Sequence, residues 1–262
     1  MRRVLILLAV GVAGCGGDDE SARRTAEPAR AVELRPFPLE SEAVGRRLDG
    51  RALVPPGGAA GRPMIVLLHG QGMSPELMVT DALRDGLERA GERAPLVLLP
   101  DGGDRSYWHD RERGDWARMV LDEAIPAAVQ RFGADGERVA IAGLSMGGFG
   151  ALHLAERRPR RFCSVSAHSP AIFPRNPPRG SPFAGAFDDA ADFERHDLIE
   201  RARRIPPGAW VDIGDRDPFT PAVREMVDRM REPRFRLWRG GHDFTFWNER
   251  ISEWLRFHLG RC

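Results

Sequence analysis

The chain of 262 residues has no lysine, only three cysteines and no excess of either charge, since 39 basic residues face 38 acidic ones. A formal net charge of +1 excludes nucleic-acid binding driven by charge. The lack of repeated long hydrophobic runs excludes a protein with several membrane spans. No glycine-rich dinucleotide or phosphate motif is found, so no cofactor is expected. The composition, 42% hydrophobic and 29% charged, is typical of a soluble globular domain.

The N-terminus has the layout of an export signal. Two arginines follow Met1, and the apolar run over residues 4–12 is too short to span a bilayer. The small residues that lead into Cys15 are typical of a bacterial lipobox. We therefore predict a signal peptide over residues 1–14, lipidation of Cys15 and a flexible tether over 15–33, which would hold the mature protein at the membrane outside the cytoplasm. The alternative is an ordinary signal peptide with a chance cysteine.

Residues 34–262 predict one α/β domain, because short apolar runs alternate with helical patterns as in parallel βαβ units. The runs are almost continuously apolar, as expected for a parallel sheet covered on both faces. The expected strands cover residues 64–68, 96–99, 139–142, 162–167, 210–213 and 235–238, with an antiparallel edge hairpin from 34–39 and 46–54. The expected helices cover residues 75–90, 115–132, 146–157, 197–204, 221–231 and 244–259.

The segment 169–192 differs from the rest because it contains five prolines and two glycines. Long loops in compact domains are typically functional or disordered. Since this one follows a central strand, we expect it to form a lid or a wall of the substrate pocket.

A nucleophile elbow is indicated at Gly143-Leu144-Ser145-Met146-Gly147, which follows an apolar strand and opens a helix. This context exposes a serine at the carboxyl ends of the strands. On such a framework the acid and then the histidine follow the serine in the chain. His242 comes directly after the last strand in a glycine-rich loop, so we expect it to be the general base. His258 lies in the apolar pattern of the final helix, where a packed or solvated histidine is expected.

The acid is expected after the strand at residues 210–213. Asp217 lies past the turn that begins at Gly214, where its carboxylate can meet the imidazole of His242, and Asp215 is the alternative. The acid would fix the tautomer of the histidine and stabilise its protonated form.

Two backbone N–H groups are expected to hold the oxyanion. Met146 follows the nucleophile and supplies one. The second would come from His69-Gly70-Gln71-Gly72, directly after an earlier strand, with Gln71 preferred over Gly70. We expect the ring of His69 to hold this loop by hydrogen bonds.

Several residues near these loops are candidates for the substrate pocket: His69, Trp108, His168 and Phe173, with Phe183 and Phe187 as further aromatics. For His168, a hydrogen-bonded histidine in a loop is the equal alternative. Asp101, Asp104, His109 and Asp110 have the residue types of a metal site, but their irregular spacing in a glycine-rich loop favours a pocket-lining loop. No metal is therefore expected.

Cys163 and Cys262 form a candidate disulfide. Cys163 lies near the start of a strand, and the final helix runs down from the histidine loop towards Cys262, so both are expected at the same end of the sheet. An exported domain would allow such a bridge. The alternatives are a buried thiol at Cys163 and a frayed terminal cysteine.

Together these motifs resemble the α/β-hydrolase superfamily. Within it, Ser106-Tyr107-Trp108, Glu123-Ala124-Ile125-Pro126 and Gly241-His242 followed by Phe246-Trp247 resemble the putative-esterase group, which includes S-formylglutathione hydrolases, feruloyl esterases and bacterial envelope mycolyltransferases. The resemblance covers about residues 46–260. It implies an α/β-hydrolase fold, with a mostly parallel central sheet and helices on both faces, and a triad of Ser145, Asp217 and His242.

The expected function is that of an exported, lipid-anchored serine hydrolase that cleaves carboxylic esters through an acyl-enzyme. One alternative is an acyltransferase acting on an envelope sugar or lipid, and another is a tethered binding protein without catalysis. The expected partners are a small-molecule or envelope ester and the membrane, reached through the anchor. No nucleic acid is expected, and the protein is expected to be a monomer.

Overall fold

The computed structural model describes residues 31–262. The predicted signal peptide, the lipidation site Cys15 and almost all of the predicted tether lie outside the described residues. Within the described part of the chain, no helix combines the length and the apolar character needed to cross a membrane.

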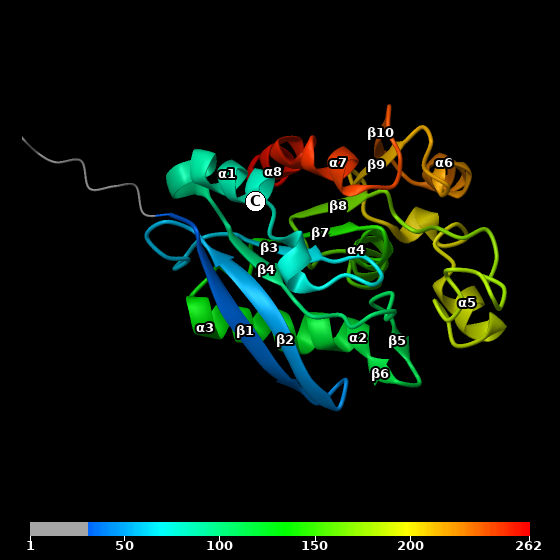
Figure 1. Ribbon diagram of the computed structural model, residues 1–262, viewed down its shortest axis with the longest axis horizontal. Coiled ribbons are helices and arrows are strands. Elements are labelled where there is room, and N and C mark those ends of the chain that lie inside the picture. Colours follow the sequence, from blue (N-terminus) through cyan, green and yellow to red (C-terminus); the bar gives the residue numbers. More distant parts are fainter. Residues whose placement is uncertain (1–30) are drawn as a thin grey trace, which may run out of the picture. The chain divides into compact units, whose positions relative to one another are not determined.

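An eight-stranded sheet forms the centre of the domain, in the order β1-β2-β4-β3-β7-β8-β9-β10 (Figure 1). The six strands from β4 to β10 in that order run parallel, whereas β2 is antiparallel to both β1 and β4. The bounds are β1 Glu33–Ser41, β2 Arg46–Val54, β3 Met64–Leu68, β4 Leu96–Leu99, β7 Val139–Leu144, β8 Ser164–His168, β9 Trp210–Gly214 and β10 Arg234–Trp238. A small separate hairpin comprises β5 Asp110–Arg111 and β6 Gly114–Asp115.

The predicted strands agree with this sheet to within about two residues, and β3 and β4 match their predicted ranges. Pro36 and Pro38 lie in β1, the outermost strand of the sheet. Prolines are tolerated there because an edge strand has no further neighbour to receive the N–H groups that they lack.

Alternate side chains of β3 show how the sheet is covered on both faces. Val66 and Leu68 pack in the core that contains α4 and α6, and Ile65 and Leu67 pack in a second core with α1, α7 and α8. Figure 1 shows α1, α7 and α8 on one side of the sheet, with α2 and α3 on the other. The predicted α/β-hydrolase arrangement of a mostly parallel sheet between two helical layers is therefore confirmed.

The helices begin and end where caps and prolines allow. Their bounds are α1 Asp81–Ala90, α2 Trp116–Arg118, α3 Ile125–Phe132, α4 Met146–Arg157, α5 Ala190–His196, α6 Thr220–Arg229, α7 Phe244–Asn248 and α8 Ile251–Leu259, with 3₁₀ turns at Pro75–Met78, Gly91–Arg93 and Ala202–Arg204 and a π-helical turn at Met119–Ala124. The predicted helix 146–157 coincides with α4.

Four predicted helices were wrong in part. The range 75–90 is split because the Thr80 side chain accepts the N–H of Leu83 and starts α1 anew. The range 115–132 contains the π-helical turn, which is followed by Pro126, a residue without an N–H group. The range 244–259 forms two helices, α7 and α8, and 197–204 contains only the turn Ala202–Arg204.

The proline-rich segment after β8 has no regular structure before α5. It is nevertheless packed, since Phe173 and Phe187 are buried in the main core. The Arg111 guanidinium donates hydrogen bonds to the Gly185 carbonyl (3.1 Å) and to Asp188 (2.7 Å). The segment is thus held against the loop that contains β5, and its role as a lid or a wall of the substrate pocket stays a prediction.

Cys163 and Cys262 are joined by a disulfide, with their Cα atoms 5.5 Å apart. The bridge ties the residue before β8 to the end of the chain after α8. Both sulfurs therefore lie at the amino end of the parallel strands, as the topology predicts.

Candidate active site

Ser145 stands on the sharp turn between β7 and α4. Its φ angle is +54°, a value that a residue with a side chain adopts at a cost. The turn closes because Gly143 and Gly147 have no side chain: a Cβ at Gly143 would collide with the Gly147 carbonyl, and one at Gly147 with the Leu68 carbonyl. This geometry places the serine at the carboxyl ends of the central strands, as the elbow motif predicts.

A chain of hydrogen bonds joins Ser145 to His242 and Asp217. Ser145 Oγ lies 2.9 Å from His242 Nε2, and His242 Nδ1 lies 2.7 Å from Asp217 Oδ2. The carboxylate of Asp217 accepts, so Nδ1 carries the proton and Nε2 presents its lone pair to the serine hydroxyl. Asp217 is 3% exposed and Ser145 8% exposed. The structure thus brings together the three residues predicted from widely separated parts of the sequence.

The choice between the two candidate acids is resolved by their partners. Asp215 Oδ1 accepts the N–H of Gly240 (3.1 Å), so it supports the loop that leads to His242. Asp217 uses its other oxygen, Oδ1, to accept the N–H of Phe219 (2.9 Å), which orients the carboxylate towards the imidazole.

Two aromatic rings flank the imidazole of His242. Phe219 and Trp247 meet it edge to face, with ring centroids 5.3 and 5.2 Å away. Trp247 is held in place because Asp243 caps α7 by accepting the N–H of Phe246 (2.9 Å). Neither ring belonged to the sequence-based pocket, although Phe219 lies only two residues after the acid.

The residues predicted for the oxyanion hole lie around Ser145. Met146 is the first residue of α4, where the N–H has no partner within the helix. Gly70 lies directly against the serine, because a Cβ there would be 3.4 Å from Ser145 Cβ. The N–H of Gln71 has no acceptor among residues 31–262. The N–H groups of Met146 and Gln71 are therefore free to bind an oxyanion.

The side chain of Gln71 is fixed at both ends of its amide. Tyr107 OH donates to Oε1 (2.9 Å), and Nε2 donates to the carbonyl of Pro182 (3.0 Å). Burial raises the pKa of Tyr107, which keeps its hydroxyl protonated as a donor. Sequence reasoning missed both partners of Gln71, since nothing local links residues 71, 107 and 182.

Three of the four predicted pocket residues are placed differently by the structure. His69 is 1% exposed, and Trp108 and His168 are 0% exposed, so none of them forms a surface that a substrate can reach. The rings pack inward because Trp108 Nε1 donates to the carbonyl of His69 (3.2 Å) and His168 Nδ1 pairs with Asp212 (3.0 Å).

His69 has the structural role that the sequence indicated. Its Nδ1 donates to the carbonyl of Gly70 (2.9 Å), and its Nε2 accepts the N–H of Gly102 (2.9 Å). Burial lowers the pKa of His69, in agreement with the neutral ring that this pair of contacts requires.

Phe173, the fourth predicted pocket residue, belongs to an aromatic cluster beside the catalytic histidine. Its ring centroid lies 5.5 Å from that of Phe219, which in turn contacts His242, and Phe183 lies 5.0 Å from Phe219. The proline-rich segment therefore places two aromatic rings, Phe173 and Phe183, in the cluster next to the triad.

The acidic residues considered for a metal site are dispersed by the structure. Asp110 Oδ1 accepts the N–H groups of Ala117 and Arg118, and its other oxygen pairs with Arg157. Asp104 pairs with Arg105. His109 instead lies beside residues of α5 that its sequence position did not suggest.

Comparison with known proteins places the chain in one family. Residues 41–258 match the family described as Putative esterase. The chain is 28% identical over 256 residues to S-formylglutathione hydrolase of Paracoccus denitrificans, with 85% of this chain and 91% of that protein covered. Among solved structures, S-formylglutathione hydrolase of Agrobacterium tumefaciens superposes with a TM-score of 0.72 at 23% identity, covering 88% of this chain and 96% of that one.

A ferulic acid esterase superposes with a TM-score of 0.77 at 22% identity, covering 88% of this chain and 99% of that one. At these identities the structural neighbours show the fold, and the match over residues 41–258 shows the family. The chain therefore belongs to the Putative esterase family of α/β-hydrolases.

Proposed function

We propose that the chain hydrolyses carboxylic esters, with Ser145 as the nucleophile, His242 as the general base and Asp217 as the acid that orients the base. The observation that carries the proposal is the continuous hydrogen-bonded chain from Asp217 through His242 to Ser145 Oγ, with distances of 2.7 and 2.9 Å. Nucleophile, base and orienting group within hydrogen-bond reach are the signature of an activated serine.

The reaction follows from this arrangement in two halves. Ser145 Oγ attacks the ester carbonyl carbon while its proton passes to His242 Nε2, and His242 then gives that proton to the departing alcohol. Water next attacks the acyl-enzyme and transfers a proton to His242. The bond to Ser145 Oγ then breaks, the carboxylic acid leaves, and His242 passes its proton to Oγ, which restores the serine hydroxyl. Asp217 holds Nδ1–H throughout and stabilises the imidazolium without becoming protonated.

The N–H groups of Met146 and Gln71 would bind the oxyanion that forms in both halves of the reaction, with Gly70 as the alternative donor. The start of α4 adds the positive end of a helix dipole, and the side-chain contacts of Gln71 with Tyr107 and Pro182 hold the second N–H in place. Donors fixed before the reaction stabilise developing charge most effectively.

The substrate class follows from what borders the triad. Phe219 and Trp247 contact the imidazole, and Phe173 and Phe183 pack against Phe219. We infer that the ester places an apolar or aromatic acyl or alcohol group against these rings, which would favour it over small acetyl esters.

We also propose that the protein is exported and anchored by lipid at Cys15. The signal-like residues 1–14 carry this proposal, and the disulfide between Cys163 and Cys262 supports it, because such bonds persist in oxidising compartments.

A fluorophosphonate probe and a panel of p-nitrophenyl esters of increasing chain length test the activity. The folded protein should be labelled at Ser145 and should release p-nitrophenol. Ser145→Ala should lose both signals, whereas Ser252→Ala on α8 should keep both. If Ser145 stays unlabelled in folded protein, the proposed hydrolase activity is rejected and a binding protein without catalysis is favoured. If an added alcohol acceptor yields mainly a new ester in place of the free acid, the protein is an acyltransferase.

A further inference from the structure

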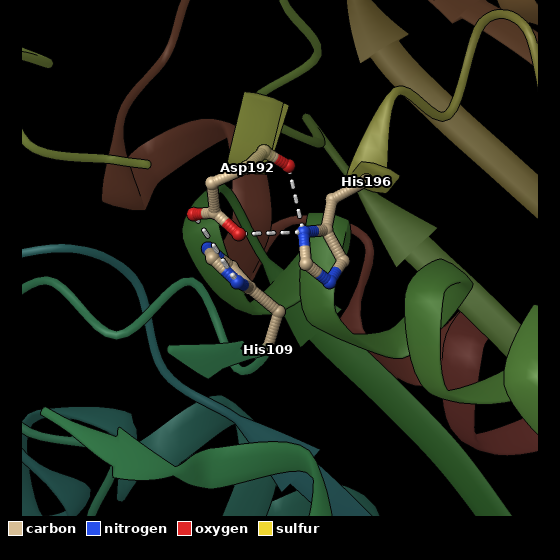
Figure 2. Close-up of side chains that lie close together, drawn as sticks. All are labelled: His109, Asp192 and His196. Atoms are coloured by element: carbon tan, nitrogen blue, oxygen red, sulfur yellow. Dashed lines mark hydrogen bonds and ion pairs between the residues drawn. The ribbon is translucent and has the colours of Figure 1, made fainter. Parts of the chain in front are cut away.

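Four buried side chains from three segments meet away from the triad. His109 comes from the loop before β5, His153 from α4, and Asp192 and His196 from α5. The four residues are 0%, 3%, 1% and 8% exposed, in that order. Figure 2 shows His109 and His196 directed at the carboxylate of Asp192 from two sides. One ligand atom from each of these three residues lies within 4.8 Å of the other two.

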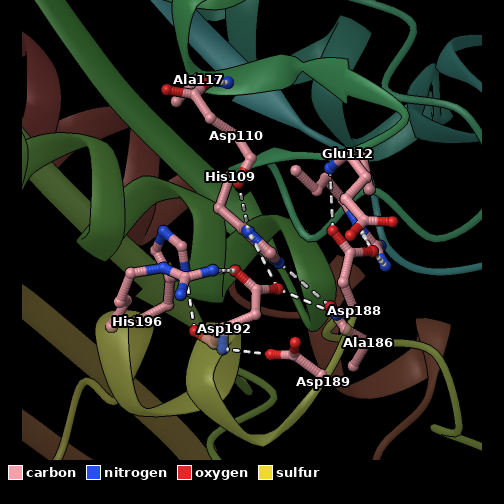
Figure 3. Close-up of polar contacts among 12 residues, drawn as sticks. His109, Asp110, Glu112, Ala117, Ala186, Asp188, Asp189, Asp192 and His196 are labelled. Atoms are coloured by element: carbon pink, nitrogen blue, oxygen red, sulfur yellow. Dashed lines mark hydrogen bonds and ion pairs between the residues drawn. The ribbon is translucent and has the colours of Figure 1, made fainter.

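The carboxylate of Asp192 and the ring of His196 are oriented by neighbours. His196 Nδ1 donates to the Asp192 backbone carbonyl (2.8 Å) and lies 3.1 Å from Asp192 Oδ1. Asp192 Oδ2 accepts the N–H of Asp188 (2.9 Å), as Figure 3 shows. Because Nδ1 of His196 carries the proton, its Nε2 presents a lone pair.

His109 has more acceptors around it than a neutral ring can satisfy. Its Nε2 lies 3.1 Å from the Ala186 carbonyl, while its Nδ1 lies 3.2 Å from the Asp110 carbonyl and 3.9 Å from Asp192 Oδ2. A neutral imidazole has one N–H. If Nε2–H donates to Ala186, the lone pair of Nδ1 faces oxygen atoms only.

His153 lacks a partner altogether. Both of its ring nitrogens are buried and form no hydrogen bond within the described part of the chain. Its ring centroid lies 5.0 Å from that of His196 and 6.4 Å from that of His109. Buried polar atoms in folded proteins almost always have a partner. The unpaired ring of His153 is therefore a second, independent observation beside the group of three, although its nitrogens lie outside the set of atoms within 4.8 Å.

We propose that His109, Asp192, His196 and His153 form a site for a divalent transition metal of the zinc type. A cation among them would accept the lone pairs of the three imidazoles and would bind the Asp192 carboxylate, whose charge is balanced in part by the Arg195 guanidinium 3.1 Å away. Imidazole nitrogen with a single carboxylate oxygen is a donor set that zinc prefers, whereas calcium and magnesium prefer oxygen ligands.

The surroundings match those of a metal ligand set in a further respect. His109 donates its remote Nε2–H to a backbone carbonyl, and His196 donates its Nδ1–H to Asp192. Such contacts fix the tautomer of ligating histidines. Zinc–ligand bonds of about 2.0–2.2 Å place tetrahedral ligand atoms about 3.4 Å apart. The three ligand atoms that lie within 4.8 Å of one another would therefore draw together around the ion, and the ring of His153 would move towards them.

The metal would have a structural role. Four protein ligands in a buried position leave no place for a reacting water, which is the pattern of a structural zinc site. The ion would tie α5, at the end of the proline-rich segment, to α4 and to the loop before β5. It would thus fix the segment beside the triad without taking part in ester hydrolysis.

Metal uptake by the protein, purified without a histidine tag and dialysed against EDTA, tests the proposal. Zinc should bind with a stoichiometry of one per chain and raise the melting temperature, and cobalt(II) should give the visible absorption of a tetrahedral site. Failure of the wild-type protein to take up either metal would overturn the proposal and leave the Arg195–Asp192 ion pair, with histidines hydrogen-bonded around it, as the explanation of the cluster.

Matched variants locate the site. Asp192→Asn should weaken zinc binding by at least about tenfold, and His153→Phe should weaken it and abolish the tetrahedral cobalt spectrum. Asp189→Asn is the control, because asparagine still caps α5 by accepting the N–H of Asp192, and it should bind zinc like the wild type. Ser145→Ala should also bind zinc normally, which separates this site from the ester hydrolase. Equal zinc affinity in Asp192→Asn and Asp189→Asn would place the metal elsewhere and reject the proposal.

Discussion

The carboxylate of Asp217 lies 2.7 Å from Nδ1 of His242, on the opposite side of the ring from Ser145. Asp215, two residues earlier, accepts a backbone N–H from Gly240 instead. Two acidic residues at the end of one strand therefore have separate tasks: one orients the imidazole, and the other holds the loop that carries it.

Asp217→Asn should lower kcat by about 10⁴-fold, because an amide at this position favours the wrong tautomer of His242. Asp215→Asn should lower kcat by less than about tenfold, since the amide oxygen can still accept the Gly240 N–H. Steady-state kinetics on p-nitrophenyl esters measure both. Equal losses, or the reverse order, would show that Asp215 is the acid.

Ser145→Ala and His242→Ala should each reduce kcat by at least about 10⁴-fold, and the double variant should lose no more than either single one, because triad residues act as a unit. Circular dichroism should show that all three variants stay folded. Multiplicative losses in the double variant would contradict a shared role for the two residues.

The central sheet was predictable because its strands are buried on both faces. The runs at residues 64–68 and 96–99 are wholly apolar, and they form β3 and β4 with the same bounds. Ser145 and His242 were predictable for another reason: an elbow between strand and helix, and a loop after the last parallel strand, necessarily open at the same edge of the sheet.

The pocket and the buried cluster were not predictable in this way. Trp108 turns inward because Gly102 and Gly150 leave room for its ring, and a Cβ at either position would collide with it. Both contacts are long-range, so no local pattern reveals them. His109, His153 and His196 likewise come from three segments, and their convergence depends on how the proline-rich segment packs.

The free energy of unfolding should fall in acid, partly because His258 takes up a proton when the chain unfolds. This ring is buried between Ser164 and Ser166, and burial, followed by His168 and Arg261, lowers its pKa from 6.5 to about 3. Below pH 6.5 the unfolded chain therefore takes up a proton that the folded chain does not. The stabilisation is present above that pH and is lost as the pH falls towards 3.

His258→Gln should flatten this dependence. Urea unfolding between pH 4 and 7 should give a slope of the unfolding free energy against pH that is smaller than in the wild type by up to about 1.4 kcal/mol per pH unit. Parallel curves for the two proteins would show that His258 does not bind its proton differently on unfolding.

Cys15→Ser should release the protein from the membrane fraction, because the variant lacks the cysteine that would carry the lipid anchor. Mass spectrometry of the wild-type protein should find a diacylglyceryl group on Cys15. A soluble wild-type protein with an unmodified N-terminus would contradict the anchor. In that case the Cys163–Cys262 disulfide could no longer be attributed to export as a lipoprotein.

The disulfide gives the last prediction, which is best tested in the Cys15→Ser background so that only Cys163 and Cys262 contribute thiols. Denatured, unreduced protein should contain no free thiol, and two free thiols would rule the bridge out.

The bond closes a loop with a sequence separation of 99 residues, for which the chain-entropy model gives a stabilisation of roughly 4–5 kcal/mol as an upper value. Replacing both cysteines with serine should therefore lower the free energy of unfolding by about 2–5 kcal/mol. Ester hydrolysis by the folded variant should stay unchanged, because the bridge lies at the amino end of the strands and the triad at the carboxyl end. A loss of activity without a loss of stability would mean that the bridge shapes the active site.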